Sequence, residues 1–505
     1  MWIESHIPVT KSATMKEFTL IRGADWLKRP EIIGLVLLGS VSAGYLISRQ
    51  GLMAGLVIAM IPVALLFLAI LFIHPRVGLY TILSLNFFAL GIYRYIPQVP
   101  WGLAVDGMLA LTFIALFFQA FHRKIEWKNA ANELTILTLI WFGYAVFQLL
   151  NPEAGSRVAW FYAVRGIALH MFLMIPLVFL LFNKQADLHR FLMIWGVFSI
   201  LGTLKGMMQK YIGVDPFEQR WLDSGGAAQH LLFGELRIFS FFADAGTFGA
   251  AQGQAGVVFS ILALGEKKIP KRIFFVIVAL LGFFGMMISG TRGALSVPFA
   301  GVLLFIILRK NLKLITMGII ALIGIFIFFK YTHIGESNGT IRRMRTAFNP
   351  NDASLKTRLN NQNMIKAYMA SRPLGAGIGS TGGIGKKYNP GTFLSKVPTD
   401  SWYVQIWMEE GVVGLTLHLC ILFFILTRIS YFVMFKLKSE RVKTPVIAMA
   451  SGMFGIMAAS YGNPVLGQMP VGIMLYTCMA FMYLSPRFDN EESNAMAIEE
   501  PKNTK

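Results

Sequence analysis

The stretch IFFVIVALLGFFGMMISGTRGALSVPFAGVLLFIIL, residues 273–308, decides the fold. It holds two apolar runs close to membrane-spanning length, joined by a short polar turn in which Arg292 is the charged residue. Inside lipid a helix satisfies its own backbone hydrogen bonds, whereas an irregular segment does not. The stretch therefore predicts a helical hairpin in a membrane, with one charge held at its surface.

The same pattern continues over most of the 505-residue chain, which is 55% hydrophobic and carries a net charge of +20. About fourteen apolar stretches have the length of membrane spans. They lie at 31–48, 52–73, 76–92, 103–121, 133–150, 167–182, 190–208, 245–265, 272–289, 293–309, 312–330, 402–428, 444–461 and 465–484. We expect an all-α integral membrane protein with about 12–14 transmembrane helices and one large external (periplasmic) loop, 331–401.

Basic residues predict which side of the membrane each turn occupies. Short turns rich in lysine and arginine fall on every second connection, as the excess of positive charge in cytoplasmic loops requires. They lie within 11–29, 123–128, 184–190, 267–272, 309–313 and 436–443. This alternation predicts a multi-pass protein of the plasma (inner) membrane with both termini in the cytoplasm. Lys267 and Lys436 should face the cytoplasm, and Arg237, Arg292 and Gly379 the outside.

The composition argues against metal, disulfide and nucleic-acid chemistry. Cys420 and Cys478 both lie in apolar stretches, so neither a disulfide framework nor a thiolate metal site is expected. Acids on the external side lack the spacing that a divalent cation needs. They include Asp215, Glu218, Asp223 and Asp352. We expect no metal, no cofactor and no nucleic-acid partner.

Glycines between residues 375 and 385 form a second pattern. No β-branched strand precedes them and Arg372-Pro373 interrupts the approach, which argues against a dinucleotide site. Successive backbone amides in such a turn are able to form an anion-binding nest. The alternative is a flexible hinge.

Arginine dominates over lysine among the external basic residues before residue 325. Its planar fork of donors binds phosphate or carboxylate bidentately, so the bias suggests recognition of an anionic group. Arg49, Arg94 and Arg157 are better explained as side chains that extend from helix ends to the membrane surface. Arg292 differs because an apolar span lies on each side of it, which favours a site residue. The alternative is that it caps carbonyls of the turn.

Four stretches together resemble one family. Residues 289–308, SGTRGALSVPFAGVLLFIIL, resemble the arginine-bearing signature of the O-antigen ligase and polymerase superfamily, membrane glycosyltransferases that use polyprenyl-diphosphate-linked glycans. The other three stretches stand in the family's order. They are 237–249 (RIFSFFADAGTFG), 371–379 (SRPLGAGIG) with Arg358 before it, and 400–415 (DSWYVQIWMEEGVVGL). The resemblance covers residues 235–430.

The resemblance implies a site on the external side. It assigns contacts with the donor diphosphate to Arg237, Arg292, Arg358 and Arg372 and to the loop glycines Gly377 and Gly379. As catalytic residues it favours Arg292 and, for the general base, Asp400, with Asp244 and Glu409 as alternatives.

The chain departs from the family at the base. Many members carry a His-Asn pair where this chain reads Thr399-Asp400-Ser401. Asp400 either replaces the histidine or caps a helix that begins at Trp402, because aspartate is a favoured N-cap. His230 and His333 are further external candidates, although nothing in the sequence ties either to a partner.

The expected function follows from the substrate that the family uses. A glycan on a lipid diphosphate has a good leaving group, so the enzyme must neutralise phosphate charge and accept a proton from the acceptor hydroxyl. We expect a metal-independent glycosyltransferase that polymerises O-antigen or exopolysaccharide repeats at the external face, because the His-Asn pair is absent. The alternatives are an O-antigen ligase acting on lipid A core or protein, and a lipid-linked glycan flippase.

The expected organisation has five parts. They are a cytoplasmic segment (1–30), an N-terminal transmembrane bundle (31–234), a ligase/polymerase-like domain with the external loop (235–430), C-terminal transmembrane helices (431–485) and a disordered cytoplasmic tail (486–505). The expected partners are a polyprenyl-diphosphate-linked glycan donor, a glycan or lipid A core acceptor, and the lipid bilayer.

Overall fold

The computed structural model describes residues 30–232, 234–337, 339–346 and 353–499. The basic segment at 11–29, Asp352 and the last residues of the expected tail lie outside the described residues. The chain divides into two units after Leu71. In the described part, the strands are β1 (Leu231–Leu232) and β2 (Glu235–Leu236), which pair antiparallel, and the rest of the regular structure is helical.

The first unit is a pair of apolar helices, α1 (Pro30–Gln50) and α2, which runs over Leu52–Ile73 and so ends just past the boundary. Gly51 joins them with φ +70°, a conformation that glycine adopts without steric cost. The most apolar window within residues 54–73 has a mean hydropathy of 3.1, and only 6% of that window is buried in the structure. Such a helix is suited to contact with lipid.

The second unit contains the other long helices. They are α3 (Arg76–Ile92), α4 (Trp101–Ala120), α5 (Glu133–Phe147), α6 (Arg157–Val164), α7 (His170–Leu181), α8 (Gln185–Tyr211), α11 (Ala245–Gly265), α12 (Ile269–Ile288), α13 (Ser296–Arg309), α14 (Leu312–Tyr331), α19 (Trp402–Tyr431), α20 (Glu440–Ala459) and α21 (Val471–Glu499). Two short helices, α9 (Pro216–Trp221) and α10 (Ala227–His230), lie between α8 and α11.

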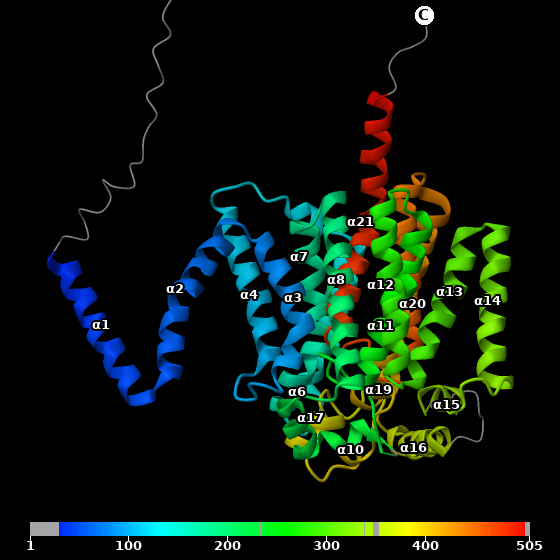
Figure 1. Ribbon diagram of the computed structural model, residues 1–505, viewed down its shortest axis with the longest axis horizontal. Helices are drawn as coiled ribbons and strands as arrows, with labels where there is room; N and C mark the ends of the chain where they lie inside the picture. The colour runs from blue at the N-terminus through cyan, green and yellow to red at the C-terminus, as the bar shows by residue number, and fades with distance from the viewer. Residues whose placement is uncertain (1–29, 233, 338, 347–352, 500–505) are drawn as a thin grey trace, which may run out of the picture. The chain divides into compact units, whose positions relative to one another are not determined.

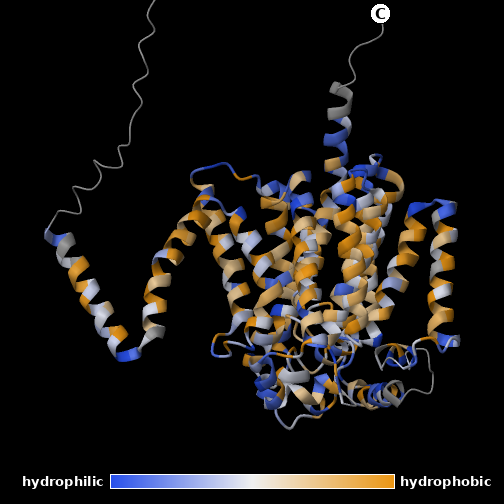
Figure 2. Cartoon of the chain, viewed as in Figure 1, coloured by the Kyte–Doolittle hydropathy of each residue, from blue (hydrophilic) through white to orange (hydrophobic). Residues whose placement is uncertain are grey.

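The helices have the character of membrane spans. In the described part of the chain, ten helical runs are long and apolar enough to cross a membrane. Each span predicted from the sequence overlaps a helix, although the last one, 465–484, begins in the loop before α21. The prediction of an all-α integral membrane protein is confirmed. Figure 2 shows hydrophobic residues along the long helices and hydrophilic residues gathered near helix ends and in the short helices.

The expected disordered tail differs from the structure over 486–499, because α21 continues through these residues. Asp489 accepts hydrogen bonds from the backbone amides of Lys438 (3.0 Å) and Ser439 (2.7 Å). These bonds attach the helix to the α19–α20 connection and satisfy two backbone amides there. They stabilise the helical conformation of this polar segment.

The segment expected as an external loop, 331–401, is itself structured. It forms α15 (Gly339–Arg345), α16 (Ala353–Met369), α17 (Gly382–Tyr388) and α18 (Phe393–Lys396). Helices α10, α15, α16 and α17 gather at one end of the second unit (Figure 1), which we call the polar end.

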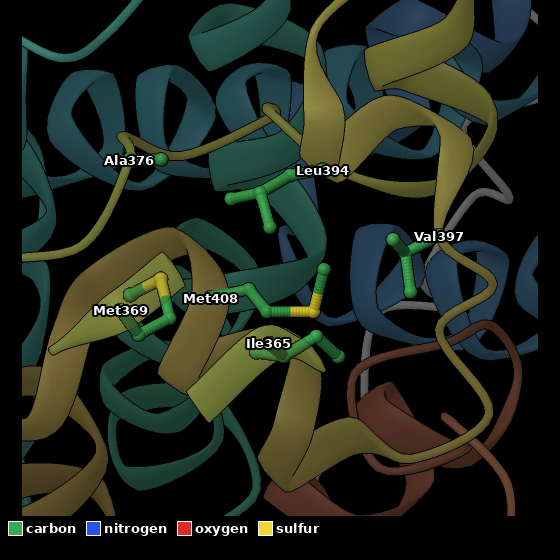
Figure 3. Packing of buried hydrophobic residues seen from close by; sticks show 6 residues of the cluster. All are labelled: Ile365, Met369, Ala376, Leu394, Val397 and Met408. Atoms are coloured by element: carbon green, nitrogen blue, oxygen red, sulfur yellow. The ribbon is translucent and has the colours of Figure 1, made fainter. Parts of the chain in front are cut away.

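An apolar cluster attaches these short helices to α19. Figure 3 shows its side chains, which come from α16, the glycine loop, α18 and α19. They are Ile365, Met369, Ala376, Leu394, Val397 and Met408. Burial of this cluster fixes α16 and the residues that precede α19, because separating them would expose the side chains to water.

Helix α11 lies in the interior of the second unit and packs against α12 and α20. A Cβ atom on Gly282 of α12 would lie 2.8 Å from the backbone nitrogen of Gly256 in α11, so the two helices meet backbone to backbone. The hydroxyl of Thr291, just after α12, donates to the carbonyl of Ala245 at the start of α11 (2.9 Å). The start of α11 and the α12–α13 turn therefore meet.

Arg94 is buried, and the interpretation of this residue as a surface-reaching side chain was wrong. Its Nη1 donates to the carbonyl of Ser240 (2.6 Å), and its Nη2 to that of Phe242. Its guanidinium lies over the rings of Trp221 (4.6 Å) and Phe239 (4.3 Å). Burial lowers the pKa of Arg94 to about 10. Arg94 thus secures the turn that leads into α11.

The contact between α11 and α12 leads to a prediction for Gly282→Val. Overpacking costs roughly 1–3 kcal/mol where neighbours give way, and the atoms facing Gly282 are backbone atoms that do not. We expect a large fall in the thermal midpoint of the detergent-solubilised protein. Gly143→Val in α5 is the matched control, because no atom lies within 4 Å of the position its Cβ would take. Equal thermal midpoints for the two variants would contradict the backbone contact between α11 and α12 at Gly282.

Candidate functional site

The polar end encloses a cavity of about 1470 Å³. Its walls come from the residues before α11, the α12–α13 turn, α15, α16, the segment from Thr381 to Asp400, the start of α19 and the α20–α21 loop. Six residues singled out from the sequence line it together. They are Arg237, Asp244, Arg292, Arg358, Asp400 and Glu409.

Arg237 is positioned by the short hairpin of β1 and β2. Its backbone amide donates to the carbonyl of His230 (2.7 Å), which extends the hairpin by one bond. Its Nη2 donates to the hydroxyl of Thr291 (3.0 Å), next to Arg292, while its Nε is buried without a hydrogen-bond partner. Burial lowers the pKa of Arg237, with Asp244 opposing the shift and the charges of Arg292 and Arg358 adding to it.

Arg292 begins a 3₁₀ turn (Arg292–Leu295), which Ser289, Gly290 and Thr291 connect to the end of α12. Gly290 allows the reversal with φ +60°. The hydroxyl of Ser289 accepts from the amide of Thr291 (3.2 Å), so polar side chains of the turn satisfy part of its backbone. The Nη1 of Arg292 donates to the hydroxyl of Thr346 (2.9 Å), which follows α15, so this arginine links the turn to α15.

α15 brings Arg342 and Arg343 to the same cavity. In the sequence the run Arg342-Arg343-x-Arg345 suggests either a site for phosphate or an acidic glycan or, more simply, a solvated loop. In the structure Arg343 is only partly exposed and lines the wall. Burial lowers the pKa of Arg343 to about 10, and repulsion from Arg237 and Arg292 contributes. Arg345 instead donates to the carbonyl of Ile334 (2.6 Å) and holds the end of α14. The cavity therefore carries a concentration of positive charge that the motifs alone did not predict.

Asp400 forms an ion pair with Arg358, with 3.5 Å between Oδ2 and Nε. Its side chain is 47% exposed, so the carboxylate is accessible from the cavity. The cap of α19 is Ser401, whose hydroxyl accepts from the amide of Val404 (3.4 Å). The alternative that Asp400 serves as the N-cap was therefore wrong, and its carboxylate has no capping bond to maintain.

The other two acidic candidates have structural hydrogen bonds. Asp244 caps α11 and accepts from the amide (2.8 Å) and hydroxyl (3.1 Å) of Thr247. Glu409 is fully buried and accepts from the amide of Gly379 (3.0 Å), from the hydroxyl of Thr381 and from Gln405 (3.4 Å). Glu409 thereby ties the glycine loop to α19, and both carboxylates are engaged.

Gly377, Gly379 and Arg372 do not line the cavity. A Cβ on Gly377 would lie 2.5 Å from that of Ala154, and one on Gly379 would lie 2.6 Å from the backbone of Ala159, so these glycines serve close packing. The amide of Gly379 is already bonded to Glu409 and so is not available to an anion, whereas Gly382 and Gly383 of the same glycine string line the cavity. Arg372 pairs with Glu153 (3.1 Å).

The two histidine candidates lie away from the cavity walls. His230 is buried against Trp221 and Phe239, and burial lowers its pKa. His333 is exposed and lies 3.1 Å from Glu336. No group of three or more metal-binding side chains occurs among the residues that the structure describes. Asp400 is thus an exposed carboxylate of the cavity wall, paired with Arg358, and Glu235 before α11 is a second one.

The α20–α21 loop also lines the cavity, and the sequence analysis missed it. Asn463, Pro464, Val465 and Gln468 contribute to the wall. The polar residues Gly462-Asn463 between two apolar runs were a weak signal, because such residues usually mark an ordinary turn.

Comparison with known protein families identifies a match over the part of the chain that contributes much of the cavity wall. Residues 254–419 match the family model described as O-antigen ligase. The match runs from α11 to α19 and contains Arg292, Arg358, Asp400 and Glu409, while Arg237 and the α20–α21 loop lie outside it. A search of curated proteins gives no match. The match over residues 254–419 supports the resemblance to the O-antigen ligase/polymerase superfamily that the sequence motifs indicated.

Proposed function

We propose that this protein is a glycosyltransferase that extends a glycan from a polyprenyl-diphosphate donor at the external face of the plasma membrane, as a polymerase of O-antigen or exopolysaccharide repeats. One observation carries the proposal. Arg237, Arg292 and Arg343, from separate parts of the chain, line one cavity and repel one another. A diphosphate would offset this charge and fit the forked donors of arginine.

The size of the cavity supports a substrate larger than a diphosphate. Typical pockets for small ligands measure about 300–1,000 Å³, whereas this cavity measures about 1470 Å³. That volume suits a diphosphate together with sugars of the donor and of the acceptor. Short helices that line the cavity, α15, α16 and α17, lie at the end of the bundle of long helices (Figure 1), which suits a donor carried by a membrane lipid.

The chemistry requires one displacement. The acceptor hydroxyl oxygen forms a bond with the anomeric carbon, and the bond from that carbon to the phosphate oxygen breaks. The electron pair passes to the diphosphate, whose added charge the arginines stabilise. The proton of the hydroxyl passes to Asp400, which Arg358 holds in place. Direct attack from the opposite side inverts the anomeric carbon.

Two other functions receive less support. A ligase to lipid A core or protein uses the same donor, but Thr399-Asp400-Ser401 stands where many ligases carry His-Asn. A flippase needs a central cavity between related halves, whereas this cavity lies at one end of the second unit and is built by unlike segments.

Arg292→Lys tests the role of the arginines. Lysine keeps the charge but loses the fork, so we expect transfer to fall by about 10²–10³-fold while the protein still inserts and purifies. The assay is glycan chain length formed from a synthetic polyprenyl-diphosphate disaccharide. Arg372→Lys is the control, because Arg372 lies off the cavity. Normal transfer by Arg292→Lys would argue that the residue is structural.

Asp400→Asn tests the base. Because Ser401 caps α19, the amide should remove proton acceptance and leave the helix intact, and the rate should fall by about 10²–10⁴-fold. Ser401→Ala should have the opposite profile, with a lower thermal midpoint and a smaller change in rate. Near-normal turnover by Asp400→Asn would exclude Asp400 as the base.

Cysteine labelling in intact cells tests whether the polar end faces the external side of the membrane. We expect a cysteine at Lys386 to react with a membrane-impermeant thiol reagent in intact cells, and one at Lys267 to be protected, after replacement of Cys420 and Cys478. Both positions are exposed, whereas Gly379 is buried and unsuited to the test. The reverse labelling pattern would invert the topology.

A further inference from the structure

We propose that Asn463, in the loop between α20 and α21, donates a hydrogen bond from its amide to the diphosphate of the lipid-linked donor. The proposal rests on the function proposed above and adds a binding residue to it. Asn463 lies beyond residues 254–419, so the family match does not include it.

The loop is held at both of its ends. The backbone amide of Trp402, the first residue of α19, donates to the carbonyl of Ser460 (2.9 Å). The hydroxyl of Thr247, in the first turn of α11, donates to Oε1 of Gln468 (2.7 Å). The loop is therefore attached both to the segment that carries Asp400 and to the helix that follows Arg237.

Two glycines make room for the Asn463 side chain. A Cβ on Gly293 would lie 2.2 Å from Nδ2 of Asn463, and one on Gly246 would lie 3.3 Å from its Oδ1. Gly293 directly follows Arg292, so the amide lies over the backbone next to that arginine. A larger residue at position 293 would displace the amide from the cavity wall.

The amide of Asn463 lacks a hydrogen-bond partner. Its Nδ2 is buried and makes no hydrogen bond in the structure, which is uncommon because buried polar groups are nearly always satisfied. Nε of Arg237, a residue that lines the same cavity, is also buried without a hydrogen-bond partner. Two buried donors on one wall point to an acceptor-rich ligand, and the oxygens of a diphosphate supply acceptors only.

The amide of Asn463 is an uncharged hydrogen-bond donor, which suits a site that already holds several arginines. Three guanidinium groups already repel one another, so a further cation would raise that repulsion. An amide adds a hydrogen bond without adding charge. As the bond to the anomeric carbon breaks, charge on the diphosphate grows and this hydrogen bond strengthens. Asn463 is thus a substrate-binding residue whose loss should affect transfer more than expression.

The test compares Asn463→Ala with wild-type protein in detergent, using the synthetic polyprenyl-diphosphate disaccharide as substrate. Hydrogen bonds to charged groups of this kind correspond to about a 10- to 100-fold change, which we expect as the loss in kcat/KM. Inhibition by inorganic pyrophosphate should weaken in parallel, because it shares the diphosphate and lacks the sugar and lipid. Asn463→Asp should lose more, since its carboxylate repels the ligand.

Two further variants make the result specific. Gly293→Ala should reproduce the loss, because its methyl group displaces the amide while every polar side chain is kept. Asn360→Asp, an exposed site on α16 outside the cavity, makes the same charge change and should have no effect.

Each outcome has one meaning. If wild-type protein transfers glycan and Asn463→Ala equals it, the inference about Asn463 is wrong and the proposed function stands. If Asn463→Ala loses transfer but pyrophosphate inhibits it as strongly as wild type, the amide contacts sugar, and the inference is also wrong. If wild-type protein transfers nothing, the proposed function itself fails.

Discussion

The backbone contact between α11 and α12 is the constraint on which the site depends. Gly256 and Gly282 admit no side chain between the helices, so the bond from Thr291 to Ala245 forms at their common end. That end carries Arg292 on one side and, before α11, Asp244 and Arg237 on the other. Without a close approach, two arginines separated by more than fifty residues would not share a wall.

Hydrogen bonding separates Asp400 from Asp244 and Glu409, the other two candidate bases on this cavity. Asp244 and Glu409 each satisfy backbone amides, and removing either would leave buried donors unsatisfied. Asp400 bonds no amide, because Ser401 provides the cap of α19, and its partner is a partly exposed arginine. The side chain of Asp400 therefore holds no backbone amide in place. This distinction favours Asp400 as the base more strongly than sequence resemblance does.

Much of this architecture could be predicted from the sequence, since the physical signals were local. Apolar runs of spanning length predicted the helices, and the order of four motifs placed Arg237, Arg292, Arg358 and Asp400 in one site. The misses have a different origin. Gly377 and Gly379 read as a phosphate loop, but their use depends on Ala154 and Ala159, which no spacing rule connects to them. Whether a glycine makes room for a ligand or for another backbone is decided by tertiary contacts.

Arg343 and Asn463 are the converse case, because the structure gives them a place on the cavity wall that the sequence did not predict. Both line the same cavity in the folded chain, where Arg343 is partly buried and Nδ2 of Asn463 is buried without a hydrogen-bond partner. Burial changes what such groups require. A solvated guanidinium or amide is satisfied by water, whereas a buried one is stable only with a ligand or a protein partner. A surplus of buried donors on one wall is therefore evidence for an anionic ligand that is independent of any motif, and here it coincides with the region that the motifs indicated.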